Sequence, residues 1–128
     1  MGLRPPVVLV GNLTTRRDFS DVRDVCRALW LLMERGRPGE PYNLCSGVAP
    51  TIAEVLELVL ERTAVRVTVQ QDPARLRPSD EPILQGDNQK LRQDTGWEPE
   101  IPLAASIDRI LAYWRARVAV AAMPSAAP

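Results

Sequence analysis

The stretch from Val7 to Val25 constrains the fold of this chain more than any other. Val7–Val10 is an unbroken run of β-branched and aliphatic residues, which is typical of a strand buried on both faces. A polar loop follows, and a helical pattern begins near Ser20. Because Arg16 and Arg17 are the only cations of this loop, we expect a ligand held there to be an anion. Phosphate is the first candidate, since a guanidinium fork matches its geometry.

Hydrophobic periodicity along the rest of the chain predicts helices that alternate with short strands. The clearest local signal is Thr51-x-x-Glu54, a capping box in front of an apolar stripe. Trp30 and Trp114 lie on or beside helical stripes and are expected in the core, and Trp97 is interpreted as a packing residue. Helices are expected over residues 21–35, 51–62, 87–95 and 103–118, and strands over 7–10, 42–45 and 65–69. This alternation indicates the α/β class.

Composition excludes several classes of protein. The 128 residues suffice for one domain, and the net charge is zero, whereas a nucleic-acid-binding protein normally has a basic excess. The absence of histidine excludes Ser-His-Asp and Cys-His catalysis and histidine metal sites. Cys26 and Cys45 fit no zinc spacing and are expected to be buried free thiols, which suits a cytoplasmic location. No apolar run has the length of about 20 residues that a membrane span needs.

A second arginine-bearing segment lies downstream at residues 75–80. There Arg77 precedes Pro78, and Asp80 follows three positions after the arginine. An arginine beside a carboxylate suits a phosphate with an adjacent sugar, because the cation binds the charge and the carboxylate accepts hydroxyl protons. The alternative is that these arginines are surface residues paired with Asp18, Asp72 or Asp80, since surface ion pairs are common.

Five ordered motifs resemble the C-terminal half of the extended short-chain dehydrogenase/reductases (the NAD-dependent epimerase/dehydratase family). The closest resemblance is to the GDP-sugar members, the GDP-4-keto-6-deoxymannose reductases and the GDP-mannose 4,6-dehydratases. The motifs are Val10–Leu13, Arg17–Val25, Gly39–Gly47, Arg75–Asp80 and Thr95–Pro99. Phe19 and the Arg-Pro-Ser-Asp motif at residues 77–80 resemble the reductases more than the dehydratases.

The resemblance implies a role for four residues. Arg17 and Arg77 would hold the nucleotide diphosphate, Asp80 would bind ribose hydroxyls, and Asn12 would lie near the nucleotide. Residues 1–118 would then form a substrate domain that binds a GDP-sugar, and residues 119–128 are expected to be a flexible tail. Asp24 is interpreted as structural. The implied fold is the small substrate-binding portion of the family, with about four helices and without the Rossmann domain.

The chain departs from the family where catalysis takes place. It has no Gly-x-x-Gly-x-x-Gly turn for a dinucleotide. It also lacks the Tyr-x-x-x-Lys pair, because the residue four positions after Tyr42 is Ser46 and the residue four positions after Tyr113 is Arg117. We therefore expect no catalytic, cofactor-binding or metal-binding residue here, although NAD(P) is implied for the intact family enzyme, and we expect the isolated chain to be inactive. Alternatively, the chain is a non-catalytic module that pairs with a separate Rossmann-domain chain or with itself through an apolar face, or an inert gene remnant.

Overall fold

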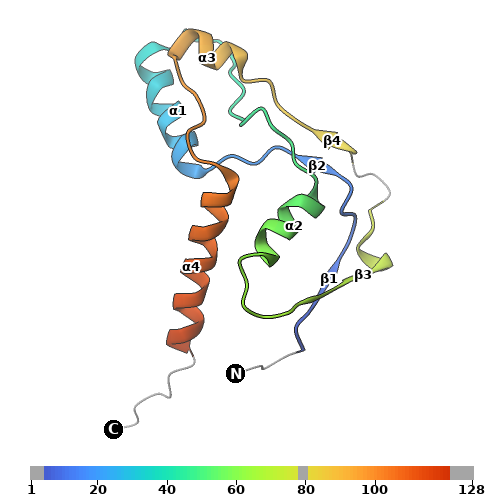
Figure 1. Ribbon diagram of the computed structural model, residues 1–128. Helices are drawn as coiled ribbons and strands as arrows, with labels where there is room; N and C mark the ends of the chain where they lie inside the picture. The colour runs from blue at the N-terminus through green and yellow to red at the C-terminus, as the bar shows by residue number, and fades with distance from the viewer. Residues whose placement is uncertain (1–4, 78–80, 122–128) are drawn as a thin grey trace.

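A computed structural model describes residues 5–77 and 81–121. It shows an α/β arrangement in which four helices accompany short parallel strands (Figure 1). In chain order the elements are β1 (Val7–Val10), β2 (Arg16–Arg17), α1 (Val22–Arg35), α2 (Ile52–Leu60), β3 (Thr68–Gln71), the 3-10 turn η1 (Pro73–Arg75), β4 (Ile83–Leu84), α3 (Gln89–Thr95) and α4 (Leu103–Ala121).

Helix boundaries follow local signals in the sequence. The capping box at Thr51 is formed, with the Glu54 amide donating to Thr51 Oγ1 and the Thr51 amide to the Glu54 carboxylate. Gly96, at φ 74°, ends α3 in the left-handed conformation. Asn88, rather than the expected Asp87, is the N-cap of α3, and α4 continues to Ala121, beyond the expected boundary at residue 118. Residues 122–128 of the expected tail lie outside the described residues.

The best-packed part of the molecule lies where α1 meets α3 at one end of the molecule (Figure 1). Ala28, Leu91 and Trp97 are almost fully buried there, which confirms the packing role of Trp97. Asp24 is also buried, and its carboxylate accepts the backbone amides of Glu100 and Ile101 at 3.0 and 2.9 Å. The structural interpretation of Asp24 is therefore confirmed, because it ties α1 to the segment between α3 and α4.

The strands form two separate two-stranded parallel sheets, β1 with β3 and β2 with β4. Of the three predicted strands, Val7–Val10 is confirmed as β1, 65–69 is found shifted to Thr68–Gln71 (β3), and 42–45 was wrong. Residues 42–45 form no strand, because Tyr42 and Leu44 pack on the α1–α3 core and the segment has no neighbouring strand among the described residues. The expected burial of β1 on both faces was wrong, since Val7, Val8 and Leu9 are 40–45% exposed. Within residues 5–77 and 81–121 only β3 pairs with β1, so neither face is covered as a buried strand requires.

The helical faces expected in the core are largely exposed. On α1, Val22, Leu29 and Met33 have exposed fractions of 69%, 49% and 83%, and Cys26 is exposed as well, whereas Cys45 is buried. Trp30 and Trp114 are 62% and 56% exposed, so the prediction that they are core residues was wrong. The helix face that packs on α3 is instead the one that carries Ala28. The apolar face of α1 lacks a partner within the described residues.

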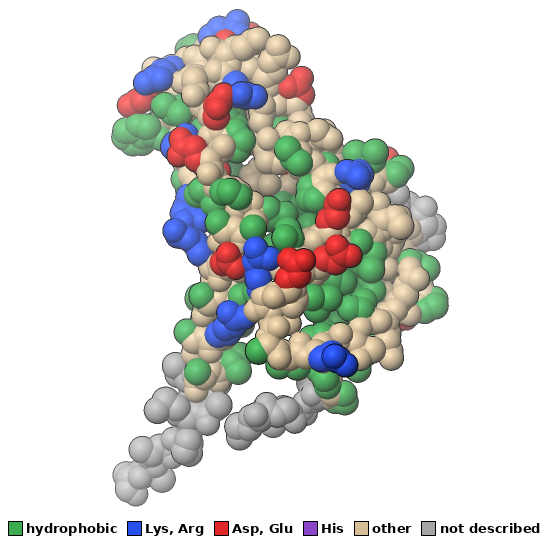
Figure 2. All heavy atoms as spheres, in the orientation of Figure 1, with side chains coloured by type: hydrophobic (Ala, Val, Ile, Leu, Met, Phe, Trp, Pro, Cys, Tyr) green, Lys and Arg blue, Asp and Glu red, His purple; other side chains and the backbone are tan. Residues whose placement is uncertain are grey.

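The chain exposes much more surface than its size requires. Its accessible area is 9764 Å². A compact protein of 14.2 kDa is expected to expose roughly 6,800 Å². The space-filling view shows hydrophobic side chains at the surface over α2 and β1, bordered by charged groups (Figure 2). The fold thus has one small core and several apolar faces open to solvent.

Candidate functional site

The two arginine-bearing segments lie side by side. Strand β2, which carries Arg17, pairs in parallel with β4, with Arg16 opposite Ile83 and Arg17 opposite Leu84. The Arg16 amide donates to the carbonyl of Pro82 at 2.8 Å. The sheet therefore fixes the loop after β1 against the chain that immediately follows the undescribed residues 78–80.

A second crossing joins the same two segments nearer their beginning. The Asp72 amide donates to the Val10 carbonyl at 2.8 Å. A Cβ atom on Gly11 would lie only 2.6 Å from the Arg75 carbonyl oxygen, so this close approach requires glycine. The loop over residues 11–15 is consequently held at both ends along the segment that contains Arg77.

The predicted substrate-binding residues are placed as follows. Arg17 is half-buried, and its Nη1 donates to the carbonyls of Arg16 and Glu81, each at 2.7 Å. Asn12 accepts from the Thr14 amide at 2.9 Å and from the Thr14 hydroxyl at 2.8 Å, so it closes a local turn. Arg77 is exposed, and Asp80 lies outside the described residues. The structure brings the segments of Arg17 and Arg77 together, while convergence of the two guanidinium groups stays a prediction.

Among the described residues of these segments, the alternative of surface ion pairs is realised at Arg75. Arg75 forms a salt bridge with Asp72 at 3.3 Å. Asp18 instead accepts bonds from Ser46 and Gly47, and Arg17 is held by carbonyl groups. Arg17, one of the two arginines that the resemblance assigns to the diphosphate, is thus held by neutral backbone oxygens rather than by a described carboxylate.

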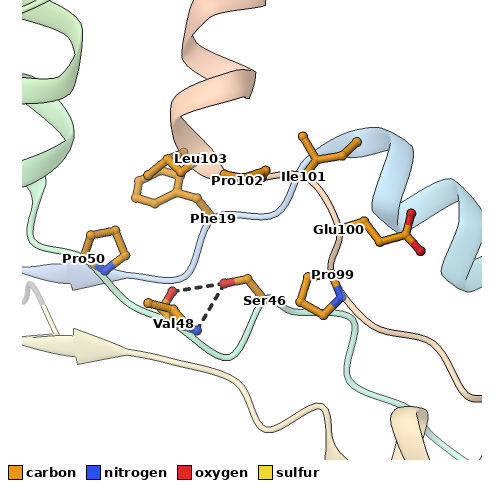
Figure 3. Close-up of a pocket in the computed structure, with 9 residues that line it drawn as sticks. All are labelled: Phe19, Ser46, Val48, Pro50, Pro99, Glu100, Ile101, Pro102 and Leu103. Carbon is orange, nitrogen blue, oxygen red and sulfur yellow. Dashed lines mark hydrogen bonds between the residues drawn. The ribbon is translucent and has the colours of Figure 1, made fainter.

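An open apolar pocket of about 410 Å³ adjoins the loop after β2. In Figure 3 the Phe19 ring lies beside Leu103 at the start of α4, and Ser46 and Val48 lie across the pocket. Three prolines and two further residues complete the lining: Pro50, Pro99, Glu100, Ile101 and Pro102. Sequence reasoning missed this pocket, although its signal was present as prolines in two segments that flank helices.

Two ionisable groups have pKa values shifted by their structural contacts. The Tyr42 hydroxyl donates to Asp94 at 2.7 Å, which together with Arg37 lowers the pKa of that carboxyl. Burial, with the nearby Asp18 charge, raises the pKa of the Cys45 thiol, so the thiol stays neutral. No group of three or more His, Cys, Asp or Glu in residues 5–77 and 81–121 could hold a metal ion. Within the same ranges, none of the helices has both the length and the apolar character of a membrane span.

Comparison with known proteins shows the family. The model of the family described as GDP-mannose 4,6 dehydratase matches residues 1–110. Over 91% of the chain, 38% of residues are identical to GDP-6-deoxy-D-mannose reductase of Pseudomonas aeruginosa, of which the chain covers 38%. GDP-mannose 4,6-dehydratase of Sinorhizobium fredii is 29% identical over 73% of the chain and 32% of that protein.

Solved structures agree. The structure of RMD from Pseudomonas aeruginosa complexed with NADPH superposes with a TM-score of 0.83 and 35% identity, over 90% of this chain and 38% of that one. UDP-glucose 4-epimerase from Thermotoga maritima with UDP-glucose has a TM-score of 0.74 and 27% identity, over 87% and 35% of the two chains. The chain spans well under half the length of these relatives. Its motifs, fold and matched residues place it in the GDP-mannose 4,6-dehydratase family of nucleotide-sugar enzymes.

Proposed function

We propose that this chain is the GDP-sugar-binding part of an NAD(P)-dependent GDP-4-keto-6-deoxymannose reductase or GDP-mannose 4,6-dehydratase, and that it is inactive when isolated. In this proposal Arg17 and Arg77 bind the diphosphate, Asp80 the ribose hydroxyls, and Asn12 lies beside the nucleotide. Residues 1–118 form the binding domain. Its two free cysteines favour a reducing compartment, so a cytoplasmic location is part of the proposal.

One observation carries the proposal: the parallel pairing of β2 with β4. Arg17 and Glu81 are 64 positions apart in the sequence, yet a guanidinium nitrogen of Arg17 bonds the Glu81 carbonyl. This pairing supports the proposal, because β4 follows Arg77 by only a few residues along the chain. A pair of guanidinium groups on two such segments offers paired N–H donors that match the oxygens of a diphosphate.

The residues present do not fit a dinucleotide. In the family that cofactor needs a glycine-rich turn between a strand and a helix N-terminus. Here Gly11 follows β1, but the chain continues into β2, and the Arg75 carbonyl fills the space beside Gly11. Relatives are described in complex with NADPH or NADH. The proposal therefore assigns no part of the NAD(P) site of the intact enzyme to the described residues of this chain.

Isothermal titration calorimetry of the purified chain with GDP tests the proposal. Wild type should bind, and Arg17→Ala and Arg77→Ala should each weaken binding by about 10- to 150-fold, because a hydrogen bond to a charged group contributes about 1.5–3 kcal/mol. Arg66→Ala is the matched control. It removes an exposed arginine near Thr68, at the opposite end of the β1–β3 pair from Gly11. Equal affinity of all four proteins, or no binding by wild type, would reject the site.

A second candidate function is an interaction module that pairs with a separate dinucleotide-binding chain or with itself. The exposed stripes of α1 and α4 favour it. We call these two stripes the α1–α4 apolar surface. A shallow pocket lined by Val22, Tyr113 and Trp114 connects them. Its members are Val22, Leu29, Trp30, Met33, Ile110, Tyr113, Trp114 and Val118, each at least 49% exposed. Apolar surface on this scale marks an interface.

Sedimentation velocity over a range of concentrations tests self-association. Because the net charge is zero, no electrostatic repulsion opposes it. Wild type should form larger species as its concentration rises, and Met33→Glu should shift the chain towards monomer. Val65→Glu, which places the same charge at an exposed residue outside this surface, is the control. A clean wild-type monomer at high concentration would contradict self-association. A neighbouring reading frame with the glycine turn and Tyr-x-x-x-Lys would then favour the separate partner chain.

A further inference from the structure

The side chain next to Arg17 is the centre of a three-bond clamp. The Asp18 carboxylate accepts the Ser46 amide at 2.8 Å, the Ser46 hydroxyl at 2.6 Å and the Gly47 amide at 2.8 Å. Gly47 has φ 81°, so the turn needs a residue without a side chain. A carboxylate that accepts three donors from a single turn fixes that turn relative to its own backbone.

The clamped turn is supported from its other side as well. Gln85 Nε2 donates to the Gly47 carbonyl at 2.6 Å, and Asn88 Nδ2 donates to the Cys45 carbonyl at 2.9 Å. Asn88 is buried, and a Cβ atom on Gly47 would lie 3.3 Å from its Nδ2. The turn is consequently a fixed support rather than a free loop, and Asp18 connects β2 to it.

The chain that leaves this turn holds the arginines. The Ala49 carbonyl accepts from Arg16 Nη1 at 2.9 Å, and the Pro50 carbonyl accepts the Arg17 amide at 3.1 Å. On the opposite side the carbonyl of Glu81 accepts from Arg17 Nη1. Arg17 is thus held between the 46–50 segment and β4. Among the described residues, its two side-chain hydrogen bonds engage a single guanidinium nitrogen, Nη1, of a group that has five N–H donors.

We propose that Asp18 is a positioning residue for Arg17. It never contacts the ligand. It fixes the 46–50 segment, whose Pro50 carbonyl holds the Arg17 backbone amide, and a fixed backbone lowers the entropy cost of ordering the Arg17 side chain on binding. This inference rests on the proposed function, because it presumes that Arg17 meets an anion. Immobilisation of one long side chain corresponds to a change of about 2- to 13-fold in affinity.

A double-mutant cycle separates positioning from general support. Asp18→Asn is nearly isosteric, and its amide nitrogen cannot accept the Gly47 N–H. GDP affinity is measured for wild type, Asp18→Asn, Arg17→Ala and the double variant. We expect Asp18→Asn to weaken binding several-fold in the wild-type background and to have no further effect once Arg17 is gone. The same factor in both backgrounds, or no effect in either, would overturn the inference.

The order of the Arg17 side chain can also be measured in the absence of GDP, which tests the positioning role of Asp18 separately from ligand binding. The Nε–H NMR signal of Arg17 reports the order of the guanidinium group through its heteronuclear NOE. It should fall in Asp18→Asn towards the value of exposed Arg66, while the circular dichroism of the chain stays that of wild type. An unchanged NOE would refute positioning even if GDP binds. If wild type fails to bind GDP but the NOE falls, the proposed ligand is wrong and the clamp on Arg17 stands.

A gentler substitution covers the case in which Asp18→Asn does not fold. Ser46→Ala removes only the hydroxyl from the clamp and leaves both backbone amides on the carboxylate. We expect a smaller loss of NOE in the same direction and a decrease of about 2-fold in GDP affinity. A full wild-type NOE and affinity in Ser46→Ala, together with an unfolded Asp18→Asn, would assign Asp18 to stability alone.

Discussion

Replacement of Asp24 by alanine should strongly destabilise the fold. The carboxylate is 3% exposed and accepts the Arg27 guanidinium at 2.8 Å as well as the amides of Glu100 and Ile101. Arg27 would keep its contact with Glu100, but both backbone amides would lose their partner. Each buried unsatisfied donor costs about 1–3 kcal/mol. Two such donors sum to about 2–6 kcal/mol, and because these amides are only part-buried we expect the lower half of that range, about 2–4 kcal/mol, as the decrease in the free energy of unfolding. This is a large share of the roughly 5–15 kcal/mol of a typical domain.

Urea unfolding followed by circular dichroism measures this decrease. Asp108→Ala is the control, because Asp108 forms an ion pair with Arg62 at 2.7 Å but is 60% exposed. Exposed pairs contribute at most about 1 kcal/mol, so the control should unfold close to wild type. If Asp24→Ala lowers the unfolding free energy no more than Asp108→Ala does, the latch between α1 and the segment after α3 contributes nothing, and the reasoning is refuted.

Three further predictions concern local features. Thr51→Ala removes the cap of α2 and should lower the unfolding free energy by about 1 kcal/mol in the same urea assay. Gly11→Ala places a Cβ against the Arg75 carbonyl, so it should cost about 1–3 kcal/mol and weaken GDP binding by separating the two segments; wild-type affinity would contradict the proposed site. Hydrogen bonds from Arg23 hold the pKa of Asp21 well below its ordinary value of 3.8. That contribution is complete above about pH 4 and is lost as the pH falls, so Asp21→Asn should lose less stability than wild type between about pH 5 and pH 2.

Local sequence signals predicted local structure well, and they failed where a partner was needed. Thr51 and Gly96 act within a few residues of themselves, so the ends of α2 and α3 could be predicted. Periodicity correctly grouped Val22 with Met33 on one face of α1, but it cannot say whether anything covers that face. Residues 42–45 have the composition of a strand, yet a ladder depends on a neighbour that the pattern does not contain.

The candidate site illustrates the same limit. Residue types pointed to Arg17 as an anion ligand, but no spacing rule pairs it with a carbonyl 64 positions away. The clamp that Asp18 forms with Ser46 and Gly47 was missed, because Asp18 was interpreted only as a possible ion-pair partner. Its sequence signal was Ser-Gly in a turn, a pair too common to assign a role.

The ladder between β2 and β4 has only two residue pairs, although it joins parts of the chain that are far apart. The few hydrogen bonds of so short a ladder must offset the entropy cost of closing a long loop. The ladder should therefore open and close many times for each global unfolding event. A diphosphate bound to both segments would hold the ladder closed. Hydrogen exchange of the Arg16 and Asp18 amides should then slow more than that of other amides. Amide protection of the β2–β4 ladder should therefore be lower in the empty chain than in the GDP-bound chain.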